Sequence, residues 1–268
     1  MELDVRDWIR PELNGFFSSR RRHTIFSSGT KGNLGRHATQ TPEESAKKAY
    51  LMGLKELAIT DHGLAHYMFG IKRSNLPVLR ARIDKLNEEY NDKGLKILMG
   101  VEANLLDFNG TVDLDADIMN YLDIVLMGFH YGIKTKNFKE QMKLSILPQI
   151  SKPFKKWHEE VTERVTDSYI KAIERYPIKI ITHPGDKIDV NIVRLAKACK
   201  EHGVALEINS SHKNLSVEDL IKIKDIDVDL YLGSDAHRLE RVGDVKEALR
   251  RADEAQIDIK RIKNIYIE

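Results

Sequence analysis

Short apolar runs alternate with longer amphipathic segments along most of the chain. The runs are continuously apolar, which is typical of strands buried on both faces of a parallel sheet that helices cover. They predict strands at about 24–26, 57–60, 96–102, 124–129, 178–182, 205–209 and 229–233, and a short extended piece at 262–267. The pattern therefore predicts an α/β protein.

The segments between these strands carry the start and stop signals of helices. Thr41 supplies an N-cap, Pro42 occupies the first helical position and Glu44 the third, so a helix is expected to run to about Met52 and to end at Gly53. Further helices are predicted at about 78–91, 161–176, 190–201 and 245–255. The basic, proline-containing stretch 134–160 is expected to be an irregular lid or excursion.

Seven strands with intervening helices and no clear linker favour one closed α/β barrel. An open doubly wound sheet is the alternative. Such a sheet would gather functional residues at a switch point and not from nearly every strand.

Ligand-type side chains stand at or near the ends of most predicted strands. They are His23, His62, Glu102, His130, His183, Asp235 and His237. In a parallel barrel the carboxyl ends of the strands meet on one face, so these residues should converge there. Imidazole and carboxylate ligands suit zinc, iron and manganese. Seven ligands exceed the three or four of one catalytic zinc, which favours two or three divalent ions with Glu102 bridging.

Six motifs carry a family resemblance. They are Thr-Asp-His-Gly (60–63), Val-Glu-Ala-Asn (101–104), Gly-Phe-His (128–130), Thr-His-Pro-Gly (182–185), Leu-Glu-Ile-Asn (206–209) and Gly-Ser-Asp-Ala-His (233–237). Together and in this order they resemble the polymerase and histidinol phosphatase (PHP) domain, and most closely its stand-alone phosphatase-like subfamily. The resemblance implies a distorted seven-stranded, TIM-barrel-like domain over residues 23–268, a trinuclear metal centre and phosphoesterase chemistry. Residues 1–22 would be an N-terminal extension.

The first motif of that family is incomplete in this chain. The family opens with a His-x-His pair, whereas here Arg21 stands two residues before His23 and Ser28-Gly29 follows where another histidine is common. One metal site would then lose up to two ligands. A second explanation is that 18–24 is similar to a translated sequencing adapter, which would make this run an assembly artefact.

The leading functional hypothesis is a metal-dependent phosphoesterase that hydrolyses a small phosphate monoester with a metal-activated hydroxide. His183, Asp235 and His212 are the catalytic candidates, and either histidine could protonate the leaving group. Arg238 and Arg241 follow the last motif and could bind the substrate phosphate through paired hydrogen bonds. The alternatives are a phosphodiesterase or nuclease acting on nucleic acid, and a degenerate barrel that binds metal or phosphate without turnover.

Composition limits the kinds of partner and compartment that fit this protein. A formal net charge of +2 over 268 residues argues against a nucleic-acid partner. The single cysteine, Cys199, excludes an internal disulfide, fits a reducing compartment and is expected in a helix core. The chain has neither an apolar run near the roughly 20 residues of a membrane span nor a secretory segment, so a cytoplasmic location is expected.

Several polar residues are expected to have only structural or solvated roles. Asp61 should orient an imidazole from behind. Ordinary core or solvated positions are predicted for His66, His158 and His202, and a solvated loop with helix-capping residues for Asp113, Asp115 and Asp117.

Overall fold

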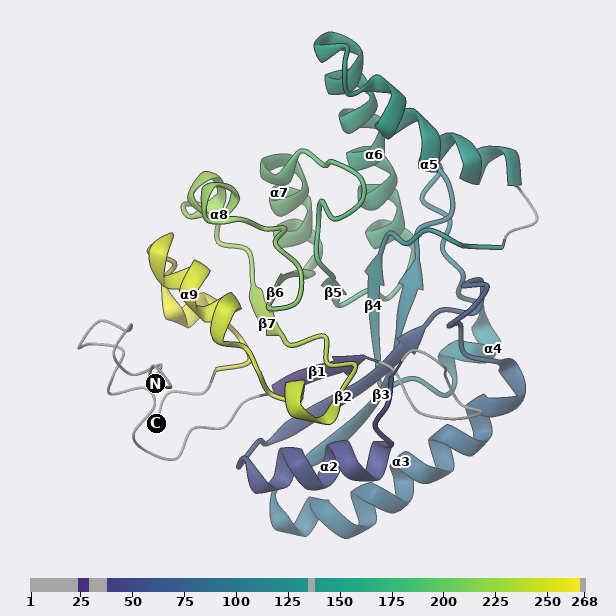
Figure 1. Cartoon of the computed structure of the whole chain (residues 1–268), viewed down its shortest axis with the longest axis vertical. Coiled ribbons are helices and arrows are strands. Elements are labelled where there is room, and N and C mark those ends of the chain that lie inside the picture. The colour runs from purple at the N-terminus through teal and green to yellow at the C-terminus, as the bar shows by residue number, and fades with distance from the viewer. Residues whose placement is uncertain (1–23, 29–37, 135–137, 266–268) are drawn as a thin grey trace.

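A parallel, curled sheet covered by helices forms the centre of the protein (Figure 1). The computed structural model describes residues 24–28, 38–134 and 138–265. The strands lie in the sheet in chain order, and every neighbouring pair is parallel. They are β1 (Thr24–Ser28), β2 (Glu56–His62), β3 (Lys96–Asn104), β4 (Ile124–Gly128), β5 (Ile180–Ile181), β6 (Ala205–Asn209) and β7 (Leu230–Gly233).

The strand order excludes the doubly wound alternative, because that arrangement reverses the order of its strands at a switch point. The predicted α/β class and the barrel-like curvature are thus confirmed. Within the described ranges, no strand pairing joins β7 to β1. Closure into a complete seven-stranded barrel stays a prediction.

Helices lie on the outer side of the sheet (Figure 1). They are α2 (Pro42–Leu51), α3 (Leu76–Tyr90), α4 (Ala116–Met119), α5 (Phe138–Ser151), α6 (Lys155–Arg175), α7 (Ile192–His202), α8 (Val217–Ile223) and α9 (Lys246–Glu254). The predicted capping box of α2 is present, because Thr41 and Glu44 each bond the other's backbone. Cys199 is fully buried in α7, as expected. No helix among the described residues is both long and apolar enough to cross a membrane.

The prediction that residues 134–160 are irregular was wrong, and their role as a lid or excursion stays a prediction. Most of this stretch is helical, as α5 and the first turns of α6. Pro148 lies inside α5, and Pro153 lies in the short connection to α6. These two prolines broke the helical pattern in the sequence, yet the structure accommodates one within a helix and uses the other between two helices.

Two further elements differ from the prediction. Helix α8 was not expected, although Ser216 and Asp219 form a capping box at its start. The extended piece at 262–267 contributes a single bridge in its described part, between Ile262 and Leu230.

Alternation along the strands sorts side chains into an outer and an inner face. Outer residues such as Leu57 and Ile59 pack in the main core beneath the helices. Inner residues from five neighbouring strands form a separate small apolar cluster, made of Ala58, Leu98, Leu126, Ile180 and Ala205. Further along the same inner face the side chains are mostly polar, as at Thr60, Glu102, Thr182, Glu207 and Asn209. The inside of the curled sheet is therefore filled by apolar side chains at one end and lined with polar side chains at the other.

Candidate metal centre

Six of the predicted ligands lie at the polar end of the sheet. His62 ends β2, Glu102 lies near the end of β3, and His130, His183, Asp235 and His237 follow β4, β5 and β7. Each belongs to the inner alternation of its strand or to the loop that directly follows. The convergence inferred from the strand-end pattern is observed for these six. His23 and Arg21 lie outside the described residues.

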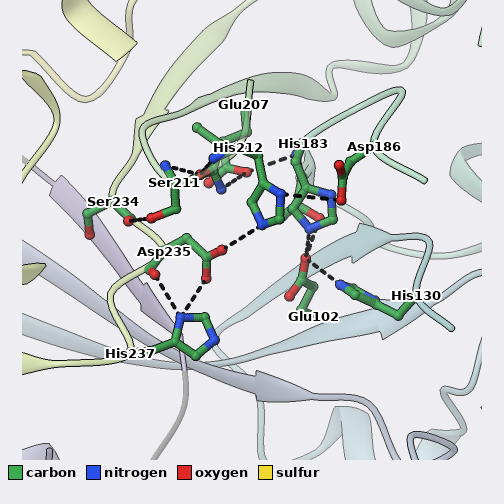
Figure 2. Close-up of polar contacts among 12 residues, drawn as sticks. Glu102, His130, His183, Asp186, Glu207, Ser211, His212, Ser234, Asp235 and His237 are labelled. Carbon is green, nitrogen blue, oxygen red and sulfur yellow. Dashed lines mark hydrogen bonds and ion pairs between the residues drawn. The ribbon is translucent and has the colours of Figure 1, made fainter. Parts of the chain in front are cut away.

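Glu102 is the centre of the first group (Figure 2). Its Oε1 lies 2.8 Å from Nε2 of His183 and 3.5 Å from Nε2 of His130, and its Oε2 lies 3.7 Å from Nδ1 of His62. Thr182 donates a hydroxyl hydrogen bond of 2.5 Å to the same Oε1. Burial raises the pKa of Glu102, but the surrounding imidazoles outweigh it and hold this pKa well below its usual range. Glu102 is therefore a buried carboxylate that stays ionised.

The donor set of this group fits a divalent transition metal. One ligand atom from each of His62, Glu102 and His130 lies within 4.8 Å of the other two. Two imidazole nitrogens and one carboxylate oxygen are ligands that suit zinc, iron or manganese. Burial lowers the pKa of His130 to about 3, so this ring is neutral, which is the form that ligates metals.

A hydrogen-bond chain behind His130 fixes which ring nitrogen faces Glu102. Asn104 donates its amide to Oδ2 of Asp113 at 2.6 Å, and its Oδ1 accepts from Nδ1 of His130 at 2.9 Å. Because an amide oxygen can only accept, Nδ1 carries the proton and Nε2 presents its lone pair toward Glu102. Asp113 also accepts from the backbone N–H groups of Asn104 and Ala65.

The hydrogen bonds of Asp113 show that the prediction for the acidic loop needs correction. Asp113 was expected to be solvated, but it is a partly buried acceptor of three hydrogen bonds that supports the orientation of Asn104 behind His130. Asp115 does cap α4, as predicted, and Asp117 is exposed. The sequence carried no sign of the difference, because alternating acids read as a solvated face wherever they occur.

Replacing Asn104 by alanine should weaken metal binding by about 10- to 100-fold, because the Nδ1 proton of His130 would lose its acceptor and the ring its orientation. The measurement is metal affinity by calorimetry on the metal-free protein. Asn120→Ala, at an exposed position after α4, is the matched control and should bind as the unchanged protein does. Equal affinities in all three proteins would contradict an orienting role for Asn104.

Asp235 is the centre of a second group, which Figure 2 shows beside the first. His212 lies between two carboxylates: its Nε2 is 3.2 Å from Oδ2 of Asp235 and its Nδ1 is 3.3 Å from Oδ2 of Asp186. Hydrogen bonds to Asp186 and then Asp235 raise the pKa of His212 to about 10. His237 places Nδ1 2.9 Å from the backbone oxygen of Asp235. Since a carbonyl only accepts, Nδ1 of His237 carries the proton.

The two groups are adjacent. The rings of His183 and His212 lie 4.6 Å apart, and those of His62 and His130 lie 4.5 Å apart. The two groups therefore form one continuous cluster of imidazoles and carboxylates. His66, predicted to be unrelated to the site, stacks on His62 at 4.7 Å, and burial lowers its pKa to about 4.

Two residues of the cluster have left-handed backbone conformations. The φ angles are +28° at His183 and +46° at Asp235. Side chains with a Cβ atom rarely adopt this region, and residues held there are concentrated at functional sites. The His183 conformation is held by its backbone N–H, which donates to Oε2 of Glu207 at 2.9 Å.

Glu207 is a buried carboxylate to which the sequence analysis gave no role. Asn209 donates to it at 3.0 Å, and burial raises its pKa to about 7. It lines a cavity inside the sheet together with Glu102, Thr182, His183, Asn209 and Asp235. The motif Leu-Glu-Ile-Asn and the inner alternation of β6 were signals that could have placed it there.

Asp186 was also missed, because it follows Pro184-Gly185 and no apolar run leads to it.

The two predicted phosphate-binding arginines differ in their surroundings. Arg238 is exposed. Arg241 pairs with Asp244 at 2.6 Å and lies 3.4 Å from Oγ of Ser211, next to His212. Asp61 is buried beside His62 in β2.

Comparison with known proteins gives a consistent picture. The PHP domain family matches residues 33–211. A protein named a probable phosphatase from Caldanaerobacter subterraneus subsp. tengcongensis is 32% identical over 261 residues, covering 92% of this chain and 86% of that protein. The probable phosphatase YcdX of Shigella flexneri is 28% identical over 257 residues, covering 91% and 87%.

A solved structure has the same fold. It is the histidinol phosphate phosphatase of Lactococcus lactis subsp. lactis, complexed with zinc, L-histidinol and phosphate. The two structures agree with a TM-score of 0.54 over 87% of this chain and 93% of that one, at 15% sequence identity.

Proposed function

Because this chain belongs to the PHP domain family, we propose that it is a metal-dependent phosphatase whose active site is the cluster around Glu102 and Asp235. The observation that carries the proposal is the buried carboxylate of Glu102, whose two oxygens lie 2.8 to 3.7 Å from nitrogens of three imidazoles. A carboxylate in this position gains nothing from core packing. It is well suited to lie between two cations.

The ligands divide between neighbouring ions in this proposal. His62, Glu102 and His130 would hold one ion, and His183, Asp235 and His237 would hold a second, with Glu102 between them. His23 would contribute to a third ion where that ion is bound, so the chain would hold two or three ions. Bound zinc, manganese or iron would supply a water ionised near neutral pH and would neutralise the phosphate oxygens. Closure of the sheet between β7 and β1 belongs to the proposal, since it would complete the ring of ligands.

The proton for the leaving group is assigned to the chain's own residues. When the ester P–O bond breaks, the departing oxygen takes a proton, and His212, whose ring lies between two carboxylates that favour its charged form, would donate it. His183 is the second candidate. Arg241, beside Ser211, would bind a phosphate oxygen after release from Asp244, and exposed Arg238 would assist. The substrate would be a small phosphate monoester, in keeping with the names of the relatives.

The test is hydrolysis of an aryl phosphate by the metal-free protein to which zinc, manganese or iron is added back. We expect turnover only with metal, and elemental analysis should find two or three ions per chain. The degenerate-barrel alternative gives one ion or none and no turnover in folded protein. The nuclease alternative gives hydrolysis of an oligonucleotide whose binding falls steeply with salt, whereas turnover of a small substrate should change little.

A further inference from the structure

Arg251 is a buried cation whose hydrogen-bond partners are backbone oxygens. It lies on α9 and is 4% exposed. One terminal nitrogen donates to the backbone oxygens of Lys213, Asn214 and Leu215 at 3.1, 2.7 and 3.0 Å. The other donates to the backbone oxygens of His212, at 3.0 Å, and Asn209. Among the described residues, the carboxylate within 4.0 Å of its guanidinium is that of Glu247, whose Oε1 lies 4.0 Å from Nε.

Four of these carbonyl groups belong to the connection between β6 and α8, which carries His212, and the fifth, that of Asn209, ends β6. Backbone oxygens taken from water need hydrogen bonds, and a planar guanidinium can serve several at once. The connection turns sharply, with Leu215 at a φ of +54°. Arg251 thus supplies hydrogen bonds to carbonyl groups of this segment that all point toward its guanidinium.

A second set of hydrogen bonds holds the residues that lead up to His212. The backbone N–H of Ala248 on α9 donates to Oγ of Ser210 at 3.0 Å. Ser211 donates its hydroxyl to the backbone oxygen of Ser234 at 2.9 Å, a contact drawn in Figure 2. The N–H groups of Ser211 and His212 both donate to Oδ1 of Asn209, at 2.7 and 3.1 Å. The backbone of His212 is therefore fixed from α9, β6 and the loop after β7.

We propose that Arg251 is a positioning residue for His212: it holds the connection between β6 and α8 so that the imidazole stays between Asp186 and Asp235. This rests on the proposed function for its effect on turnover. Its geometric part stands alone, because the bonds of Arg251 to the loop do not depend on any substrate.

The variant that tests it is Arg251→Lys, which keeps the charge but lacks the fork that reaches five oxygens. Its matched control is Arg250→Lys, since Arg250 is the neighbouring residue on α9 and pairs only with Glu247 and Glu254 at the surface among its described contacts. We expect Arg251→Lys to lower kcat on the aryl phosphate by about 10- to 100-fold, the effect of a misplaced catalytic group, with KM and metal content unchanged. Amide exchange at Ser211 and His212 should become faster. Arg250→Lys should alter none of these.

A double variant separates positioning from general destabilisation. In a His212→Ala background, Arg251→Lys should cost nothing further in kcat if it acts through His212. Added guanidinium, far below denaturing concentrations, should restore part of the kcat of Arg251→Ala and none of the kcat of Arg251→Ala with His212→Ala. Additive losses, a parallel fall in metal content, or unchanged exchange at Ser211 and His212 would overturn the proposal.

The proposal can still be tested if the unchanged protein is inactive or if the variant does not fold. If the unchanged protein has no phosphatase activity, the proposed function fails while amide exchange still decides whether Arg251 holds the loop. If Arg251→Lys does not fold, Ser210→Ala removes the other tether to α9. It should then lower kcat by about threefold and speed exchange at His212, in proportion to one lost hydrogen bond; no change in either would count against the proposal.

Discussion

Glu102→Gln should abolish the phosphatase reaction while leaving the protein folded. The amide keeps the shape of the side chain but carries no charge, so the three surrounding imidazoles lose the anion that draws cations to this position. We expect kcat/KM to fall by about a thousandfold or more, as when a central electrostatic contact of an active site is removed. Elemental analysis should find at least one ion fewer per chain.

The control for this variant is Glu240→Gln, which removes an equal charge from an exposed position near the same end of the sheet. It should retain both activity and metal. Circular dichroism of Glu102→Gln should match that of the unchanged protein. Full activity in Glu102→Gln would mean that the metal centre is wrongly assigned, whatever the behaviour of the control.

Gly233→Ala should destabilise the protein by overpacking the inner face of the sheet. A Cβ atom at Gly233 would lie 1.7 Å from Oε1 of Glu207, which no rotation of the new methyl group can relieve. The carboxylate of Glu207 would have to move, and with it the acceptor of the His183 N–H. We expect a loss of about 1–3 kcal/mol in the free energy of unfolding, typical of overpacking, measured by urea titration.

A compensating variant makes this prediction specific. In protein that carries Glu207→Ala, the space beside residue 233 is open, so adding Gly233→Ala should cost much less than it does alone. Gly203→Ala is not a suitable control, because a φ of +64° there makes any Cβ strained. Ser216→Ala, which removes only a helix cap, gives a reference loss of about 1 kcal/mol. Equal losses from Gly233→Ala with and without Glu207 would contradict a clash.

The sequence predicted the parallel sheet and the six converging ligands because both depend on local patterns. An apolar run that ends in an imidazole or carboxylate places that residue at a strand end, as it did for His62 and Asp235. Helix α2 was predicted within a few residues for the same reason, since its capping box and first-turn proline lie at its start.

The residues that the sequence did not reveal act through contacts between distant segments. Asp186 contacts His212, 26 positions away, and Arg251 binds backbone oxygens 36 to 42 positions earlier. Asp113 reaches back to Ala65 across 48 positions. A carboxylate or an arginine in such a place looks like an ordinary surface charge, because nothing nearby in the chain indicates that it will be buried.

The left-handed backbones of His183 and Asp235 have a consequence for how this protein can be improved. Glycine or asparagine would relax both positions, so a screen that rewards heat resistance alone would favour variants that have discarded two of the proposed ligands. Selection for turnover must keep the strained residues, and stability must then be gained elsewhere, in the helices and loops far from the carboxyl end of the sheet. In evolved variants, His183 and Asp235 should therefore be replaced where only heat resistance was selected. They should be retained where turnover was selected as well.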